Sequence, residues 1–301
     1  MSANGLAPLS QAHSEDLIPW VIEARDEIAG GDQSPIAVSR PGPLFRVSVA
    51  PEGRAMPPYS VGDLLEWHGE TGERREFSIA SVPGGRALDL IVRRVELPVG
   101  GMGAASWALT ADNAPHRINA RIRAYPNYHE AAGHGPLLAV AAGSGWGGVR
   151  AHILRAMQQG RPVWLIYGER GPSDDLSLFT EMRRWQAEGG IKRLDLALSR
   201  SADQQAPKYA QDVVARNAAS IADFLGEGGT ITICGATAMG DGVHGALEAA
   251  LPAGWIETAR ASERWRSATF LKAARVSLPL RRRTRPRKTP TGEEQDTDRG
   301  F

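Results

Sequence analysis

Three glycines in the segment AAGSGWGG (residues 141–148) could bind a phosphate group. Gly143, Gly145 and Gly148 fit the pattern G-x-G-x-x-G, between an apolar run of strand length and a segment with a helical pattern. Glycines at such a turn let backbone N–H groups approach a pyrophosphate at a helix start. The pattern alone also fits an ordinary glycine-rich turn. Glu169 ends the next apolar run, where a dinucleotide fold holds its ribose-binding acid, which would favour NAD.

A second polar group favours a different nucleotide. Ser199 and Arg200 end the apolar run LALSRS, and Lys208, Tyr209 and Gln211 follow shortly after in KYAQD. Cationic side chains near the carboxyl end of a strand could hold the ribose 2′-phosphate of NADP, and the tyrosine could cover the adenine. The alternative is a solvated loop followed by the polar start of a helix.

Two further segments carry residues able to do chemistry. Cys234 ends the run TITICG, either as a buried small apolar residue or beside a bound ring, since ligands of open α/β sheets lie at strand carboxyl ends. Arg75, Phe77 and Ser78 lie within four positions of RREFSIAS (residues 74–81), which otherwise reads as a strand. This combination of a cation, an aromatic ring and a hydroxyl requires an explanation.

Composition limits the classes of protein to consider. The chain has 301 residues, a net charge of +1 and 42% hydrophobic residues, enough for about two domains with a real core. A single cysteine excludes an internal disulfide and a Cys-rich metal site. We expect no metal site, no signal peptide, no membrane span, no nucleic-acid partner and a cytoplasmic location.

The elements that must position these residues change in kind along the chain. Residues 43–130 contain short, often alternating apolar segments between Gly and Pro turns, which predicts a small antiparallel β-barrel. Residues 135–270 alternate apolar strand-length runs with helical segments, which predicts a Rossmann-like α/β domain with a parallel sheet covered on both faces. Residues 1–42 are expected to form an N-terminal extension with a short helix in EDLIPWVIEARDEIAG (15–30). Residues 271–301 are expected to form a disordered basic and polar tail.

The order of the motifs resembles the ferredoxin–NADP reductase superfamily over residues 43 to 270. The segments are REFSIAS, GGMGAASWAL, AAGSGWGG, YGER, LSRS with KYAQD, and CGATAMGDGV. The resemblance is strongest to the flavin-reductase half of the sulfite reductase flavoprotein subunit and its diflavin relatives. It implies that the β-barrel binds FAD and that the α/β domain binds NADP.

The resemblance explains the RREFS segment through the family's Arg-x-Tyr-Ser motif. It implies that Arg75 pairs with the FAD pyrophosphate, that Phe77 stacks on the isoalloxazine, and that Ser78 hydrogen-bonds near flavin N5. Phenylalanine in place of tyrosine loses one phenolic hydrogen bond, worth about 1 kcal/mol. Gly103 and Ser106, in GGMGAASWAL, match the second flavin motif, which holds the pyrophosphate at a helix start.

The resemblance also assigns the nucleotide site and tips the cofactor to NADPH, against the argument from Glu169. It implies that Gly143 and Gly145 lie on the pyrophosphate and that Cys234 lies beside the nicotinamide. The remaining residues implied to bind this cofactor are Arg170, Ser199, Arg200, Lys208, Tyr209 and Gln211. Lys208 is one residue closer to the tyrosine than the family lysine.

The sequence departs from the family pattern at several positions. Trp146 and Gly148 alter the glycine loop, in which the family has isoleucine and proline, and Ala236 replaces a frequent acid. In RWRSATF (264–270), Phe270 matches the aromatic that shields the flavin, whereas Ala268 stands where an aspartate is expected.

These features together predict a flavoprotein oxidoreductase. NADPH would deliver hydride to FAD, with Ser78, Cys234 and Phe270 at the reacting rings, and the electrons would pass to an unknown protein or small molecule. No flavodoxin domain fits before residue 43, so we expect a separate acceptor. Two alternatives stay open: an NADH-dependent flavin or ferric reductase, and a catalytically degenerate subunit that acts as a binding module.

Overall fold

Two sheets of different kinds follow one another along the chain in the computed structural model, which describes residues 16–30, 42–97, 101–170 and 177–270. All of these residues fall within one compact unit, residues 1–271. The first sheet has six antiparallel strands: β1 (Ile18–Ala29), β2 (Leu44–Pro51), β3 (Leu64–His68), β4 (Arg74–Ser78), β5 (Leu88–Arg93) and β6 (Arg117–Arg123).

The antiparallel sheet closes on itself. Its strand order is β4-β3-β6-β1-β2-β5, so β4 and β5 form its two edges. An antiparallel bridge between Ile79, just after β4, and Leu90 of β5 joins those edges. Alternate residues of the strands point inward to a core that includes Trp20, Leu65 and Leu90, with the short helix α1 (Ala104–Thr110) packed against it. The predicted small antiparallel barrel is confirmed.

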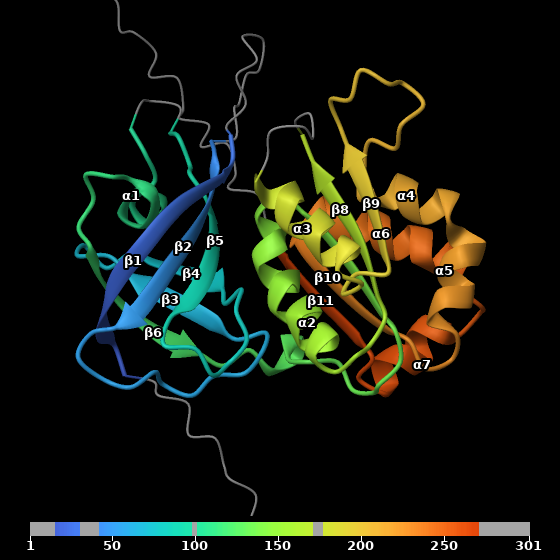
Figure 1. Cartoon of the computed structure of the whole chain (residues 1–301), viewed down its shortest axis with the longest axis horizontal. Coiled ribbons are helices and arrows are strands. Elements are labelled where there is room, and N and C mark those ends of the chain that lie inside the picture. The colour runs from blue at the N-terminus through green and yellow to red at the C-terminus, as the bar shows by residue number, and fades with distance from the viewer. Residues whose placement is uncertain (1–15, 31–41, 98–100, 171–176, 271–301) are drawn as a thin grey trace, which may run out of the picture. The chain divides into compact units, whose positions relative to one another are not determined.

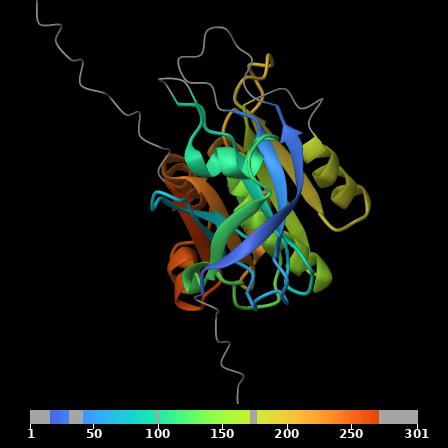
Figure 2. The ribbon, with the colours of Figure 1, turned by 90° about the vertical axis from the view of Figure 1, so that its left-hand side faces the viewer.

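The helix predicted within residues 15–30 is wrong, because this segment forms strand β1 in the middle of the antiparallel sheet. β1 pairs with both β2 and β6, as Figure 2 shows from the side of this sheet. Ile18, Trp20 and Ile22 are buried in alternation, which is the period of a strand, and Pro19 would interrupt a helix. Residues 18–29 therefore belong to the first sheet rather than to an N-terminal extension. Residues 1–15 and 31–41 of that expected extension, and the expected tail at 271–301, lie outside the described residues.

The second sheet has five parallel strands in the order β11-β10-β7-β8-β9. Their bounds are β7 (Leu137–Ala142), β8 (Val163–Glu169), β9 (Arg193–Leu198), β10 (Thr230–Ala236) and β11 (Trp265–Phe270). The helices of this half are α2 (Trp146–Gln158), α3 (Ser177–Ala187), α4 (Ala210–Arg216), α5 (Ala218–Leu225), α6 (Thr237–Ala250) and α7 (Trp255–Ala261).

Helices cover both faces of the parallel sheet, as its apolar strands require. Leu137 and Ala139 of β7 pack with α2 and α3 on one face, whereas Leu138 and Val140 pack with α4 to α7 on the other. Figure 1 shows the two layers of helices with the sheet between them. The prediction of a parallel α/β sheet after an antiparallel barrel is confirmed.

A short 3-10 turn, η1 (Pro126–Tyr128), connects the two sheets and packs into the core. Tyr128 is fully buried, and the ring of His152, from α2, meets it edge-on at 4.9 Å between centroids. The buried Asp63 accepts hydrogen bonds from the backbone N–H of Tyr125 at 2.9 Å and from His129 Nε2 at 2.6 Å. These contacts fix the connection on both sides of the turn.

Burial of His152 should make the protein sensitive to acid. Burial, with a smaller contribution from the charge of Arg266, lowers the pKa of His152 from 6.5 to about 3. The unfolded chain therefore takes up a proton below about pH 6.5 that the folded chain refuses, so stability falls as the pH falls, by up to about 1.4 kcal/mol per pH unit. We expect His152→Gln to flatten the decline in unfolding free energy between pH 6.5 and 4.5, measured by urea denaturation.

The exposed His134 provides the matched control for this experiment. His134→Gln should leave the pH dependence as it is in the parent protein. An equally steep decline in His152→Gln and in the parent would show that His152 is not the source of the acid sensitivity.

Candidate functional site

The glycine loop lies where the sequence predicts it, between β7 and α2. Gly143 has a positive φ of 57° and begins a 3-10 turn, η2 (Gly143–Gly145), that leads directly into α2. A Cβ atom on Gly145 would overlap the carbonyl oxygen of Cys234, and one on Gly148 would overlap the Cys234 sulfur. Two of the three motif glycines are therefore required by close packing against β10, whatever else the loop binds.

One face of β5, formed by Asp89, Ile91 and Arg93, meets this loop and the start of α2. We call these three residues the β5 face. A Cβ atom on Gly147 would lie 3.1 Å from Ile91 Cβ, and one on Gly143 would lie 3.2 Å from Arg93 Nη2. Residues two apart in a strand share a face, so a single strand of the barrel lines the loop along its length. These residues are not among the sites predicted from the sequence, although their alternation in LDLIVRR is a usable signal.

A buried arginine joins the two halves at the first of these positions. Arg150 of α2 donates to the carbonyl oxygen of Ala80 at 2.8 Å and lies 3.5 Å from an Asp89 carboxylate oxygen. The same guanidinium binds Glu181 of α3 at 2.7 Å and lies over the Trp185 ring. A buried arginine without its partners would be strongly destabilising, so these bonds hold α2 and α3 against the barrel.

Arg93 and Glu169 form an ion pair at the other end of the β5 face. Arg93 Nη2 lies 2.8 Å from Glu169 Oε2, and Arg93 Nη1 donates to the carbonyl oxygen of Gly42 at 3.1 Å. The side chains of Arg93 and Glu169 are only 17% and 8% exposed. Glu169 also accepts from the backbone N–H of Arg170 at 2.9 Å. Its carboxylate is therefore already bound by groups of this chain, which weakens the sequence-based prediction that it binds a ribose and selects NAD.

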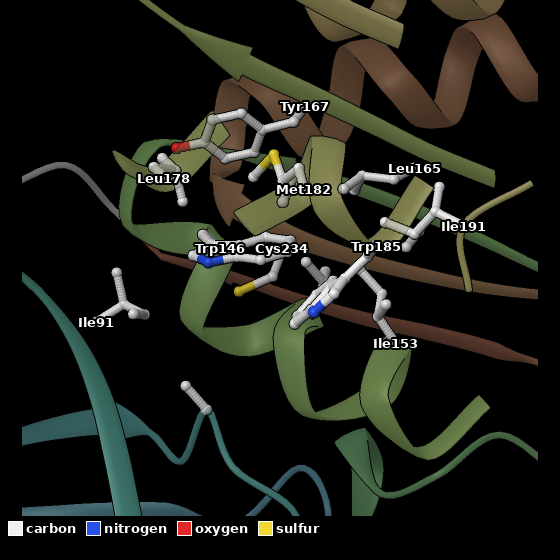
Figure 3. Packing of buried hydrophobic residues seen from close by; sticks show 14 of the residues in the cluster. Ile91, Trp146, Ile153, Leu165, Tyr167, Leu178, Met182, Trp185, Ile191 and Cys234 are labelled. Carbon is white, nitrogen blue, oxygen red and sulfur yellow. The ribbon is translucent and has the colours of Figure 1, made fainter. Parts of the chain in front are cut away.

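Cys234 is buried in the core, with its sulfur facing the start of α2. Figure 3 shows Cys234 beside Trp146. The Cys234 thiol also lies close to Gly148 and to the Tyr128 hydroxyl. Burial raises the pKa of the Cys234 thiol to about 12, against smaller lowering by hydrogen bonds with Tyr128 and the Gly148 backbone. The thiol is neutral at physiological pH. Of the two interpretations of Cys234 from the sequence, that of a buried apolar residue agrees better with this position.

Trp146, the largest departure from the family's glycine loop, turns into the core. It is fully buried, and its ring centroid lies 5.7 Å from that of Trp185 and 6.0 Å from that of Tyr167. Figure 3 shows these rings packed together between α2, α3 and the sheet. The bulky side chain therefore belongs to the core, while Gly143 and Ser144 of the loop stay partly exposed.

The RREFS segment forms β4, an edge strand of the antiparallel sheet. Arg75 and Phe77 lie on one face of the strand and Ser78 on the other, because strand residues alternate. Arg75 is exposed, and Phe77 is half-buried against the barrel core. β4 also contacts α2, so this edge borders the α/β half of the molecule.

Ser106 is committed to local hydrogen bonds at the start of α1. Its hydroxyl donates to the carbonyl oxygen of Gly103 at 2.9 Å and accepts from the backbone N–H of Val95 at 3.1 Å, and the residue is buried. The predicted contact of this hydroxyl with a pyrophosphate conflicts with those bonds. Gly103 remains a candidate through its backbone.

The predicted 2′-phosphate residues lie together at the carboxyl ends of β8 and β9. The backbone N–H of Ser199 donates to the carbonyl oxygen of Glu169 at 3.0 Å, and that of Leu198 to Pro207 at 3.2 Å. These bonds bring together the chain segments that carry Arg170, Ser199, Arg200, Lys208 and Tyr209. Tyr209 is 57% exposed, whereas Gln211 packs against Gly242 of α6 and so lies farther into the protein.

Phe270 lies at the carboxyl end of β11, at the same edge of the sheet as the glycine loop. It pairs in register with Ala236 and is 42% exposed, and Ala268 pairs with Cys234. The position of this exposed aromatic is compatible with the predicted contact to a flat ring. That contact stays a prediction.

Other candidate sites in the described residues are weak. A cavity of about 420 Å³ lies at the amino ends of β8 and β9, opposite the glycine loop. No cluster of three His, Cys, Asp or Glu side chains suitable for a metal occurs among the residues described. Within the same residues, no helix has the length and apolar character to cross a membrane.

Comparisons with known proteins agree with this architecture. A family model described as "Oxidoreductase NAD-binding domain" matches residues 139–245. The sulfite reductase [NADPH] flavoprotein alpha-component of Thiocapsa roseopersicina is 32% identical over 183 residues, covering 54% of this chain and 34% of that protein. That of Vibrio parahaemolyticus is 33% identical over 115 residues, covering 37% of this chain and 18% of that protein. The chain thus spans about a third of the length of the first relative and less of the second.

A solved structure shares the fold. Ferredoxin-NADP+ reductase from Plasmodium falciparum superposes with a TM-score of 0.66 at 15% identity, covering 84% of this chain and 96% of that one. The fold is therefore an antiparallel barrel followed by a parallel α/β sheet, as in that reductase. The chain resembles the ferredoxin–NADP reductase superfamily, in sequence through the sulfite reductase flavoproteins and in fold through the ferredoxin reductases.

The packing of Gly148 yields a test of the loop geometry. An alanine normally stabilises a helix by about 0.5–1 kcal/mol relative to glycine. At Gly148 the added Cβ would overlap the Cys234 sulfur, and such overpacking costs about 1–3 kcal/mol. We expect Gly148→Ala to lower the free energy of unfolding in urea, and Cys234→Ala in the same chain to restore part of the loss.

Gly245 of α6 is the matched control, because a Cβ there would meet no atom within 4 Å. Gly245→Ala should leave stability unchanged or raise it. Equal effects of the two glycine substitutions would contradict the close approach of Cys234 to the loop.

Proposed function

We propose that the protein is a flavoprotein reductase that takes hydride from NADPH through FAD and passes the electrons to a separate acceptor. The observation that carries the proposal is the contact between the glycine loop and the β5 face. A nucleotide on the loop and a flavin on the barrel would then lie next to each other, as hydride transfer between two rings requires.

The residues of β4 fit an FAD molecule. Arg75 is an exposed cation suited to a pyrophosphate, and two residues on, Phe77 offers part of an aromatic face on the same side of the strand. Gly103 would add backbone N–H groups at the start of α1. Ser106, whose hydroxyl is bound locally, would contribute by holding Gly103 in place.

The carboxyl edge of the parallel sheet fits a dinucleotide. Gly143 and Gly145 would carry the pyrophosphate, while Arg200 and Lys208 supply positive charge for a 2′-phosphate. Those basic residues and the flavoprotein relatives, whose name specifies NADPH, favour NADPH over NADH. The exposed ring of Tyr209 would cover the adenine.

When bound, the flavin accepts two electrons as hydride and can release them one at a time, which is chemistry the protein side chains cannot supply. Ser78 would donate or accept a hydrogen bond beside the reacting rings. Cys234, with its neutral buried thiol, would act by packing rather than as an acid or base. Phe270 would shield the flavin from solvent. None of these roles requires the missing aspartate at Ala268.

Absorbance spectroscopy of the purified protein under anaerobic conditions tests the proposal. We expect flavin bands, or bands that appear after incubation with FAD, and their bleaching by NADPH more readily than by NADH. Bleaching by NADH alone would favour the NADH-dependent reductase. Failure to bind any flavin would contradict the proposal and favour the non-catalytic binding module.

The two adjacent arginines of β4, Arg74 and Arg75, allow a specific test of the proposed FAD contact. Arg75→Ala should weaken FAD binding about tenfold, the usual scale for loss of one charge-assisted hydrogen bond. Arg74 is also exposed but lies on the other face of the strand, so Arg74→Ala should change the affinity for FAD less than about twofold. Equal effects of the two changes would exclude a direct contact of Arg75 with the cofactor.

A further inference from the structure

The positively charged side chain of Arg93 lies against Gly143, the first glycine of the loop. If Gly143 carried a Cβ atom, the atom within 4 Å of it, apart from the adjacent residues Ala142 and Ser144, would be Arg93 Nη2 at 3.2 Å. The guanidinium group of Arg93 thus lies directly beside the partly exposed Gly143. Guanidinium groups bind phosphate oxygens in pairs of hydrogen bonds, so this position suits a pyrophosphate on the loop.

The anion that Arg93 holds in this structure is a carboxylate of the chain itself. Glu169 Oε2 lies 2.8 Å from Arg93 Nη2, and Glu169 Oε1 accepts from the backbone N–H of Arg170. Both side chains are mostly buried. The Tyr167 hydroxyl lies 2.9 Å from the carbonyl oxygen of Gly143 and 3.2 Å from Glu169 Oε2, so a single side chain touches both the loop and the carboxylate.

We propose that Glu169 is an internal competitor for Arg93, which a nucleotide pyrophosphate must displace to bind the loop. The inference rests on the proposed function. It reverses the expected role of Glu169: instead of holding the ribose, the carboxylate lowers the affinity for the nucleotide. Two anions cannot share the guanidinium without repulsion, so removing the charge of Glu169 should favour the phosphate twice, by freeing Arg93 and by ending that repulsion.

Calorimetric titration of the full chain with FAD bound tests this competition. We expect Glu169→Gln to bind NADP+ about tenfold more tightly than the parent, the scale of one charge-assisted hydrogen bond. 2′-AMP, which has a 2′-phosphate but no pyrophosphate, should bind both proteins within about twofold. The KM for NADPH should fall while kcat stays the same, because an interaction of the bound nucleotide has changed and not one of the reaction itself.

Glu66 supplies a matched control. It is also a buried glutamate paired with an arginine, Arg121 at 3.0 Å, but it lies on β3 of the barrel and not at the glycine loop. Glu66→Gln should cost stability and leave the affinity for NADP+ unchanged. An equal gain in affinity in Glu66→Gln would show a general charge effect and overturn the assignment to Arg93.

The remaining outcomes separate this inference from the proposed function. NADP+ binding by the parent protein with no gain, or a loss, in Glu169→Gln overturns the inference alone. Failure of the parent to bind NADP+ overturns both. If Glu169→Gln does not fold, Glu169→Asp replaces it, because the shorter side chain withdraws the carboxylate from Arg93. It should show a smaller gain of the same sign, and no gain overturns the proposal.

Discussion

Alternation along β5 places Asp89, Ile91 and Arg93 on one face of a strand, and this face meets the segment that joins β7 to α2. Each of the three contacts is of a different kind. Arg150 lies 3.5 Å from an Asp89 carboxylate oxygen, Ile91 packs against Gly147, and Arg93 lies beside Gly143. Because Arg150 is buried and bonds both Ala80 of the barrel and Glu181 of α3, a shift of α2 along the barrel would leave a buried charge without its partners.

The same packing explains why the loop has its unusual sequence. Glycines at 145 and 148 allow β10 and the Cys234 sulfur to approach α2, while Trp146 fills the core between α2 and α3. The loop, whose sequence alone is weak evidence for a phosphate site, thus packs closely against strands of both sheets. Its outer surface stays open at Gly143, where the ion pair of Arg93 and Glu169 lies. Close packing therefore constrains Gly145 and Gly148, whereas the proposed nucleotide contact would use Gly143.

The sequence predicted features that depend on local pattern and missed those that depend on distant partners. Strand and helix periods in residues 43–270 predict both sheets except for strand β1, and they place the glycine loop between a strand and a helix. The sequence does not show β1 as a strand, because two bulges, near Glu23 and Ile28, interrupt the alternation after Ile22. The bonds of Glu169 and Ser106 within the protein cannot be predicted from spacing, because their partners, Arg93 and Val95, come from other segments. No spacing rule links Arg150 to Ala80, seventy residues away.

Hydrogen–deuterium exchange measured by mass spectrometry, with and without NADP+ on the FAD-loaded protein, tests the central claim that the β5 face and the glycine loop form one unit. Amide exchange reports local opening, which a ligand suppresses where it stabilises the structure. The account predicts that NADP+ protects peptides from residues 88–94 together with those from 143–150, although they lie in different sheets. Protection confined to the loop, with unchanged exchange in β5, would contradict it.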